Sequence, residues 1–352
     1  MKKPAPPEAE ETSSVPEPRA NPLLRGHAAA EAKVAEAMRA GRLHHAWLIT
    51  GPPGIGKATL AYRFARRLFV GPPEGDSLAV DEHHPVFRRV AIGSHADLLS
   101  VERAINEKTK RMRTEIVVDD AREIPHFMHL TAAEGGWRVV VVDGAEDLNR
   151  NAANALLKML EEPPNRAVLL LTCAAPGRLL PTIRSRCRRL RLSPLGDEDM
   201  AALLATYLPE ADPATRDRLI GLADGSIGGA LEIARGGGIA IAGLAREVLA
   251  AVPDLPLTRA HAIADKIGRD EDAFGMLMNL LRAGLAAAVR DAARGVAGEE
   301  QLRMLGTRPL DAWVDVWHAL TRLQDETEGA HLDKRQAIVA GFALLAGKSP
   351  GI

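Results

Sequence analysis

The stretch LITGPPGIGKATL, at residues 48–60, constrains this chain more than any other part of the sequence. It fits the pattern G-x-x-x-x-G-K through Gly51, Gly54, Gly56 and Lys57. An apolar, strand-like run precedes the pattern, and a helical stretch follows it. In such a loop the glycines let backbone N–H groups point at phosphate oxygens, and the helix that follows adds its positive end. The pattern therefore predicts a phosphate-binding loop between a strand and a helix.

The loop lacks one chemical group that normally accompanies it. A Ser or Thr after the lysine binds the Mg²⁺ that bridges the β and γ phosphates of a nucleotide, and this chain has Ala58 there. Thr59 is not an obvious substitute, because one step along a helix rotates a side chain by about 100°. We therefore expect a phosphate site that holds ATP, ADP or no nucleotide, and in which magnesium binding is weak or absent. The expected lining residues are Gly51, Gly54, Ile55, Gly56, Lys57, Ala58 and Thr59.

A second nucleotide-related pattern occurs at VVVVDGAEDL, residues 139–148. An apolar strand that ends in an acid, here Asp143, is the second motif of nucleotide-binding folds, and it reaches the metal through water. Hydrolytic versions usually have Glu next, whereas this chain has Gly144. Glu146 and Asp147 lie beyond the strand end, where a turn or helix-capping role is the simpler interpretation. Asp143 itself has the alternative of being an ordinary strand-end acid.

Short β-branched runs alternate with helical stretches in the first half of the chain. The runs are AWLIT, VFRRVAI, EIVVDD, RVVVVDG, AVLLLTC and RLRL. Continuous apolar strands separated by helices predict an α/β fold with a parallel sheet that is covered on both faces. After residue 195 the strand-like runs end and the pattern becomes helical.

These patterns predict four regions. Residues 1–20 are rich in Pro, Glu and Ala and have almost no large apolar side chains, so we expect a disordered tail. A nucleotide-binding-type domain is expected over 21–195, a helical lid over 196–241, and a helical oligomerisation domain over 242–352. In that last region two apolar helix faces each fit either a bundle core or a contact between subunits: Trp313, Trp317 and Leu320, and Ile338, Phe342 and Leu345.

Composition excludes several classes. The formal net charge is −1, which argues against a dedicated nucleic-acid binder, and no run approaches the length of a membrane span. We therefore expect a cytoplasmic protein. Cys173 and Cys187 lie in separate segments without C-x-x-C spacing, so neither a zinc site nor any other metal site is predicted.

The segment RSRCRRLR, at residues 184–191, concentrates five arginines. Arginine is suited to stabilising charge on a transferring phosphoryl group, including from a neighbouring subunit. Arg186 is therefore a candidate arginine finger acting in trans. A basic patch that contacts DNA phosphates or solvent is the alternative, and spacing alone does not separate the two.

Taken together, these residues resemble the AAA+ clamp-loader ATPases of bacterial DNA polymerase III. The resemblance is carried by GRLHHAWLITGPPGIGKATLA, NRNAANALLKMLEEPPNRAVLLLTC and LLPTIRSRC, and it covers residues 41–192 densely. It implies a P-loop AAA+ domain, a small lid and a helical collar. It also implies a hetero-pentamer in which gamma/tau-type ATPase subunits, a delta subunit and a stator-like subunit load a sliding clamp on primed DNA. Nucleotidyl transfer would reside in another subunit of the polymerase.

Within that family the chain is most similar to the stator-like subunit, which is generally not the one that hydrolyses ATP. Ser185, Arg186 and Cys187 match the family's Ser-Arg-Cys motif, whose arginine reaches the neighbouring ATP site. Thr172 falls where the family has its first nucleotide sensor. The lid motif of the hydrolysing members has an arginine where this chain has Gly228, in GSIGGAL. The resemblance thus implies weak or absent intrinsic ATPase activity.

Two other functions stay open. A competent AAA+ ATPase of the motor or helicase-loader type would need Glu146 or another acid as its base. A DNA-binding adaptor would depend on the arginine cluster, and its binding to primed duplex would weaken with salt.

Overall fold

A computed structural model describes residues 15–105, 112–134, 136–235, 237–268, 270–306, 308–330 and 332–347. The chain divides into two compact units, Met1–Ala230 and Leu231–Ile352. This division falls inside the predicted lid, so the lid boundaries of 196 and 241 stay a prediction.

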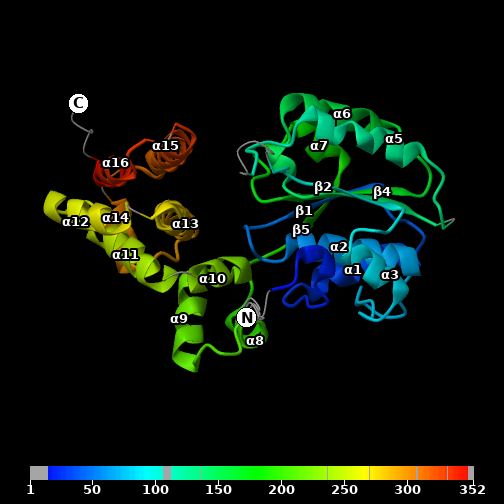
Figure 1. Ribbon diagram of the computed structural model, residues 1–352, viewed down its shortest axis with the longest axis horizontal. Helices are drawn as coiled ribbons and strands as arrows, with labels where there is room; N and C mark the ends of the chain where they lie inside the picture. Colours follow the sequence, from blue (N-terminus) through cyan, green and yellow to red (C-terminus); the bar gives the residue numbers. More distant parts are fainter. Residues whose placement is uncertain are drawn as a thin grey trace, which may run out of the picture. The chain divides into compact units, whose positions relative to one another are not determined.

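The first unit is built on a five-stranded parallel sheet (Figure 1). Its strands are β1 (Ala46–Thr50), β2 (Leu98–Val101), β3 (Arg138–Val142), β4 (Ala167–Cys173) and β5 (Arg188–Arg191), in the order β2-β3-β4-β1-β5. The chain leaves β1 toward one edge of the sheet and leaves β4 toward the other. Ligands of open parallel sheets bind at such a switch point, outside the carboxyl ends of the strands.

The strands are apolar because both faces of the sheet are covered. In β1, Trp47 and Ile49 pack with one layer of helices, while Ala46 and Leu48 pack with the other. The first layer is α1 (Ala28–Arg39), α2 (Lys57–Val70) and α3 (Pro85–Ala91). The second is α4 (Val118–Ala121), α5 (Glu123–His129), α6 (Arg150–Glu161) and α7 (Pro181–Arg186), on the opposite face in Figure 1. The predicted parallel α/β fold is confirmed.

Two predicted strands are wrong. VFRRVAI forms helix α3, because Pro85 occupies the first turn, His84 caps it by accepting the N–H of Val86, and the buried residues follow helical spacing. EIVVDD supplies only a single bridge at Ile116 before α4 begins. Strand β2, with the sequence LLSV, was not predicted, since only Val101 of its four residues is buried.

Residues 15–20 differ from the predicted tail. Pro18–Ala20 forms a 3-10 turn, and the buried Arg66 donates hydrogen bonds to the carbonyls of Arg19 and Asn21. Asn21 also bonds the hydroxyl of Tyr207. These contacts give the segment partners that its composition does not reveal. The remainder of the predicted tail, residues 1–14, lies outside the described residues.

Three helices follow the sheet: α8 (Asp197–Tyr207), α9 (Pro213–Ala223) and α10 (Ile227–Ala234). Helix α9 begins at Pro213, with Asp212 accepting the N–H of Thr215 as its cap. Between α9 and α10, Asp224 and Gly225 take left-handed conformations that reverse the chain.

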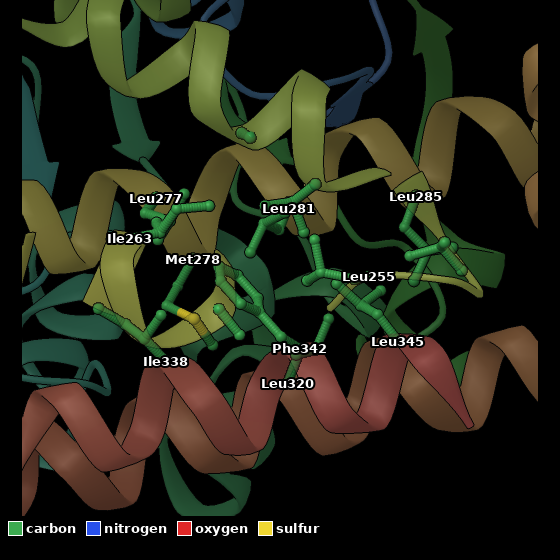
Figure 2. Close-up of a cluster of buried hydrophobic side chains, with 14 of the residues drawn as sticks. Leu255, Ile263, Leu277, Met278, Leu281, Leu285, Leu320, Ile338, Phe342 and Leu345 are labelled. Atoms are coloured by element: carbon green, nitrogen blue, oxygen red, sulfur yellow. The ribbon is translucent and has the colours of Figure 1, made fainter. Parts of the chain in front are cut away.

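The second unit is entirely helical within its described residues. Its helices are α11 (Gly238–Ala251), α12 (Leu257–Ile267), α13 (Glu271–Arg294), α14 (Glu299–Leu305), α15 (Leu310–Gly329) and α16 (Lys334–Ala346). Figure 2 shows Met278 of α13, Leu320 of α15 and Phe342 of α16 directed into one apolar cluster.

Both apolar faces predicted in this region contribute to that cluster. Trp313, Leu320, Ile338, Phe342 and Leu345 are buried in it, and Trp317 packs against it. The bundle-core interpretation is therefore the one that fits.

Among the described residues, α13 is the one unbroken helix that is long and apolar enough to be a candidate membrane span, over Asp272–Arg294. It supplies Phe274, Leu277, Met278 and Leu281 to the same cluster, so packing in the bundle accounts for its apolar residues.

Candidate functional site

The phosphate loop lies at the carboxyl end of β1 and leads directly into α2. Gly54 and Gly56 have φ values of 72° and 101°, which residues with a side chain adopt only with strain. Gly51 donates its N–H to the carbonyl of Cys173, which attaches the loop to the end of β4. The backbone thus has the conformation that the glycine spacing predicts, with the first turn of α2 beginning at Lys57.

The ammonium group of Lys57 is hydrogen-bonded within the loop. Its Nζ donates to the carbonyl of Pro52 at 2.6 Å. Burial lowers the pKa of Lys57, while the carboxylates of Glu146 and Asp143 oppose this shift. A phosphate placed in the loop would therefore have to take this ammonium group from a backbone oxygen.

The two residues after Lys57 differ in burial. Ala58 is half-buried, and Thr59 is 8% exposed within α2. Ile55 is buried in the layer formed by α1 and α2. The glycines, Lys57 and the start of α2 fit a phosphate group, but Ala58 offers no hydroxyl to a metal.

The turn into α10 packs directly against the loop. Ser226 Oγ donates to the carbonyl of Pro53 at 3.0 Å, and the N–H of Gly228 donates to the carbonyl of Gly54 at 2.9 Å. A Cβ on Gly228 would lie 2.9 Å from the Cα of Gly54, which is closer than backbone can tolerate. Gly228 is therefore required for this contact, and an arginine at that position is incompatible with it.

Asp143 and Thr172 come together at the ends of β3 and β4. The Thr172 hydroxyl donates to Asp143 Oδ1 at 2.5 Å and accepts the N–H of Gly144 at 3.0 Å. Thr172 is 1% exposed. The two predicted site residues are thus bonded to each other at the carboxyl edge of the sheet, where the phosphate loop also lies.

The acids after Asp143 make structural contacts. Glu146 Oε1 accepts the N–H groups of Ala174 and Ala175, at 2.6 and 3.3 Å. Asp147 pairs with Arg103 and Arg178, at 3.3 and 3.8 Å. Glu146 therefore holds the chain that follows β4, which agrees with the turn role considered from the sequence.

Both cysteine side chains are protonated thiols at neutral pH. Burial and the neighbouring Glu146 raise the pKa of Cys173 to about 12, and burial raises the pKa of Cys187 to about 12. Across the described ranges, no group of three or more His, Cys, Asp or Glu side chains is arranged to hold a metal ion.

One contact of the phosphate loop could not be predicted from the sequence. His27 is 4% exposed, and its Nε2 lies 2.7 Å from the carbonyl of Ile55, so it ties the segment before α1 to the phosphate loop. Nothing in the position of a single histidine 28 residues before Ile55 points to this contact.

Arg186 lies at the other end of the sheet. It ends α7, immediately before β5, and β5 runs parallel to β1 with Arg188 opposite Trp47. The phosphate loop follows the last residue of β1, so the length of the strand, about 15 Å at 3.3 Å per residue, separates the two. The Arg186 side chain is 35% exposed and pairs with Glu161 at 2.8 Å. The structure therefore keeps Arg186 away from the chain's own phosphate loop.

A parallel sheet in this strand order, with a phosphate loop after β1 and an acid after β3, defines the first unit as a P-loop fold of the AAA+ class. Residues 26–196, just under half of the chain, match the family described as DNA polymerase III, delta subunit.

Three individual proteins are similar to this chain. The chain is 38% identical to DNA polymerase III subunit delta' of Pseudomonas aeruginosa over 182 residues, which are 52% of this chain and 53% of that protein. It is 32% identical to DNA polymerase III subunit tau of Salmonella typhimurium over 209 residues, 57% of this chain and 30% of that one. A gamma subunit-related protein of Thermotoga maritima has a similar crystal structure, with 20% identity, a TM-score of 0.44, and coverage of 92% of this chain and 99% of that one. The chain thus spans about half the length of the delta' relative.

Proposed function

We propose that the chain is a delta'-type clamp-loader subunit that hydrolyses little or no ATP itself and supplies Arg186 to a neighbouring ATPase subunit. Its partners would be gamma/tau-type and delta subunits in a hetero-pentamer, together with the sliding clamp and primed DNA. The complex would act in the cytoplasm during DNA replication.

The observation that carries this proposal is the position of Arg186 at the opposite end of the sheet from the phosphate loop. An arginine there cannot serve the chain's own nucleotide, and its guanidinium is partly exposed. Arginine fingers supplied by a neighbour stabilise the charge that develops on a transferring phosphoryl group. Arg186 is the matched arginine of the Ser-Arg-Cys motif, so its role in trans is the function we assign to it.

Weak intrinsic hydrolysis follows from the loop end of the sheet. Ala58 offers no ligand to magnesium, and Gly144 replaces the usual base. Glu146, the substitute that a competent ATPase would need, already accepts two backbone N–H groups. We infer that the loop can still accept the phosphates of ATP or ADP through its N–H groups and Lys57, with little help from magnesium.

The test is ATP turnover by the complete complex, assembled with tau/gamma-type and delta subunits from the same organism and stimulated by clamp and primed DNA. We expect Arg186→Ala to lower turnover by about 10³- to 10⁵-fold while the complex still forms, since arginine fingers have effects of that size. Arg189→Ala is the matched control, because Arg189 is exposed on β5 and forms no ion pair in the described part of the chain.

Two results would contradict the proposal. Rapid magnesium-dependent turnover by the isolated chain would favour the competent ATPase. An equal, salt-dependent loss of DNA binding in the Arg186 and Arg189 variants, with turnover per bound complex unchanged, would favour the DNA-binding adaptor.

A further inference from the structure

We propose that Glu161 is a positioning residue for Arg186: it holds the guanidinium at the exposed end of α7 in an orientation ready for the neighbouring subunit's phosphate. This inference rests on the proposed function, because it concerns how the same arginine acts.

The guanidinium of Arg186 is held from two sides. Nη2 donates to Glu161 Oε1 at 2.8 Å, and Nη1 donates to the carbonyl of Thr182 at 3.0 Å, one turn earlier in α7. Glu161 is the last residue of α6, so its carboxylate comes from a different helix. Two anchors on separate helices fix the plane of the guanidinium as well as its position.

The helices that carry these anchors are themselves fixed. Ile183 of α7 and Leu179 just before it are buried in the same apolar layer as Leu156 and Leu160 of α6. Each of these four side chains is no more than 3% exposed. The end of α6 and the end of α7 therefore keep their separation, and the Glu161–Arg186 pair does not depend on flexible segments.

Holding the arginine in this way leaves it able to act. A guanidinium has five N–H donors, and the two bonds to Glu161 and Thr182 use two of them. Three donors remain for a phosphate that approaches from outside. Arginine side chains lose rotamer freedom when they are fixed, and Glu161 imposes part of that order before the subunits meet.

The Glu161–Arg186 ion pair is exposed enough that it orients the guanidinium but does not prevent it from binding a phosphate. The side chains are 35% exposed for Arg186 and 52% exposed for Glu161. Ion pairs with this exposure are weak, because water screens them. A phosphate carries more negative charge than one carboxylate and can compete for the same donors, so the pair can shift toward the neighbour's site without a large barrier.

The experiment measures kcat and KM for ATP in the assembled complex for four variants: Glu161→Gln, Glu162→Gln, Arg186→Ala and the double variant Glu161→Gln/Arg186→Ala. Glu162 is the matched control, because it is the next residue, is exposed, and makes no ion pair within the described residues. We expect Glu161→Gln to lower kcat by about tenfold, below the 10²-fold that a misplacement of about 1 Å can cost. KM and complex formation should stay unchanged, Glu162→Gln should match wild type, and the double variant should match Arg186→Ala.

The possible failures are distinguishable. If Arg186→Ala has its large effect but Glu161→Gln equals Glu162→Gln, the positioning role is wrong and the proposed function stands. If Glu161→Gln lowers kcat further in the Arg186→Ala background, Glu161 acts independently of the arginine, and the inference is again wrong. If Arg186→Ala leaves kcat unchanged, both the inference and the proposed function fail.

Discussion

The two ends of the parallel sheet use their polar side chains in different ways. At the carboxyl end, Lys57 bonds Pro52, Asp143 bonds Thr172, and Ser226 bonds Pro53, so each group is satisfied inside the unit. At the amino end, the Arg186 guanidinium is partly exposed, and its bonds to Glu161 and Thr182 use two of its five N–H donors. Under the proposed function, the phosphate loop is kept as a structural frame and the chemistry depends on an arginine elsewhere. Substitutions on the loop side should then change stability, and substitutions at Arg186 should change turnover.

The largest effect on stability is expected from Glu31, which ties α1 to the helix that follows the loop. Glu31 accepts from Arg63 Nε at 2.6 Å and from the N–H of Leu78 at 2.9 Å, and both charged side chains are at most 10% exposed. Glu31→Ala leaves a buried arginine unpaired, so we expect the free energy of unfolding of the first unit to fall by about 3–5 kcal/mol. Urea unfolding, with hydrogen exchange of the β1 and β4 amides as the probe, would measure this loss of free energy.

Glu36→Ala is the control for this prediction, since Glu36 is on the same helix and exposed. It should change the free energy of unfolding by less than about 0.5 kcal/mol. A similar loss in both variants would mean that helix α1 tolerates neither change, and that the buried pair has no special role. Complexes that form with Glu31→Ala should turn over ATP at the wild-type rate.

A smaller effect is expected from Gly228, where the turn into α10 meets the loop. Gly228→Ala puts a Cβ 2.9 Å from the Cα of Gly54, and backbone on both sides has to shift. We expect a loss of about 1–3 kcal/mol, as for other overpacked sites. Differential scanning calorimetry of the isolated chain would detect it as a lower Tm of the first unit.

Gly221→Ala is the matched control, because Gly221 is also helical, in α9, and a Cβ there meets no atom within 4 Å. Alanine favours helix over glycine, so this variant should be neutral or slightly more stable. If Gly228→Ala were equally harmless, the contact between Gly54 and Gly228 would not restrain the lid. The contact would then not explain why this position lacks an arginine.

Much of the frame could be predicted from the sequence, because loop spacing and strand hydrophobicity are local. The motif identified Gly54, Gly56 and Lys57, and the apolar runs at β1, β3 and β4 identified the buried strands. Long-range contacts could not be predicted in this way. The sequence shows that position 228 is a glycine and not an arginine. It does not show that Gly228 packs against Gly54, because the two residues are 174 positions apart.

The assignments that failed had weak local signals. Phe87 and Val90 belong to a short run that is β-branched and also helically spaced, and the cap at His84 decided the outcome. His27 is buried against Ile55 by the packing of α1 on the loop, which no motif encodes.

The smallest effect is expected from His95. It tests whether a polar side chain contributes to stability because it is buried, whichever end of the sheet it occupies. His95 precedes β2, at the same end of the sheet as Arg186, but it is 3% exposed and stacks on Phe69 at 3.9 Å between ring centroids. Burial lowers the pKa of His95, with Glu134 and Asp97 opposing the shift and Arg89 adding to it. Below the unfolded-state pKa of about 6.5, the unfolded chain therefore binds more protons than the folded chain, and stability falls as the pH is lowered.

His95→Phe keeps a ring for the contact with Phe69 and removes the titration. We expect its free energy of unfolding to depend less on pH between pH 7 and pH 5 than that of the wild type. Measurements at pH 8, where the imidazole is neutral in both states, separate this change in slope from any constant loss of packing. If the two pH profiles were parallel, His95 would have the same pKa in the folded and unfolded chains. Burial of a polar side chain at the amino end would then not change the free energy of unfolding through its titration. The difference between the two ends of the sheet would need another cause.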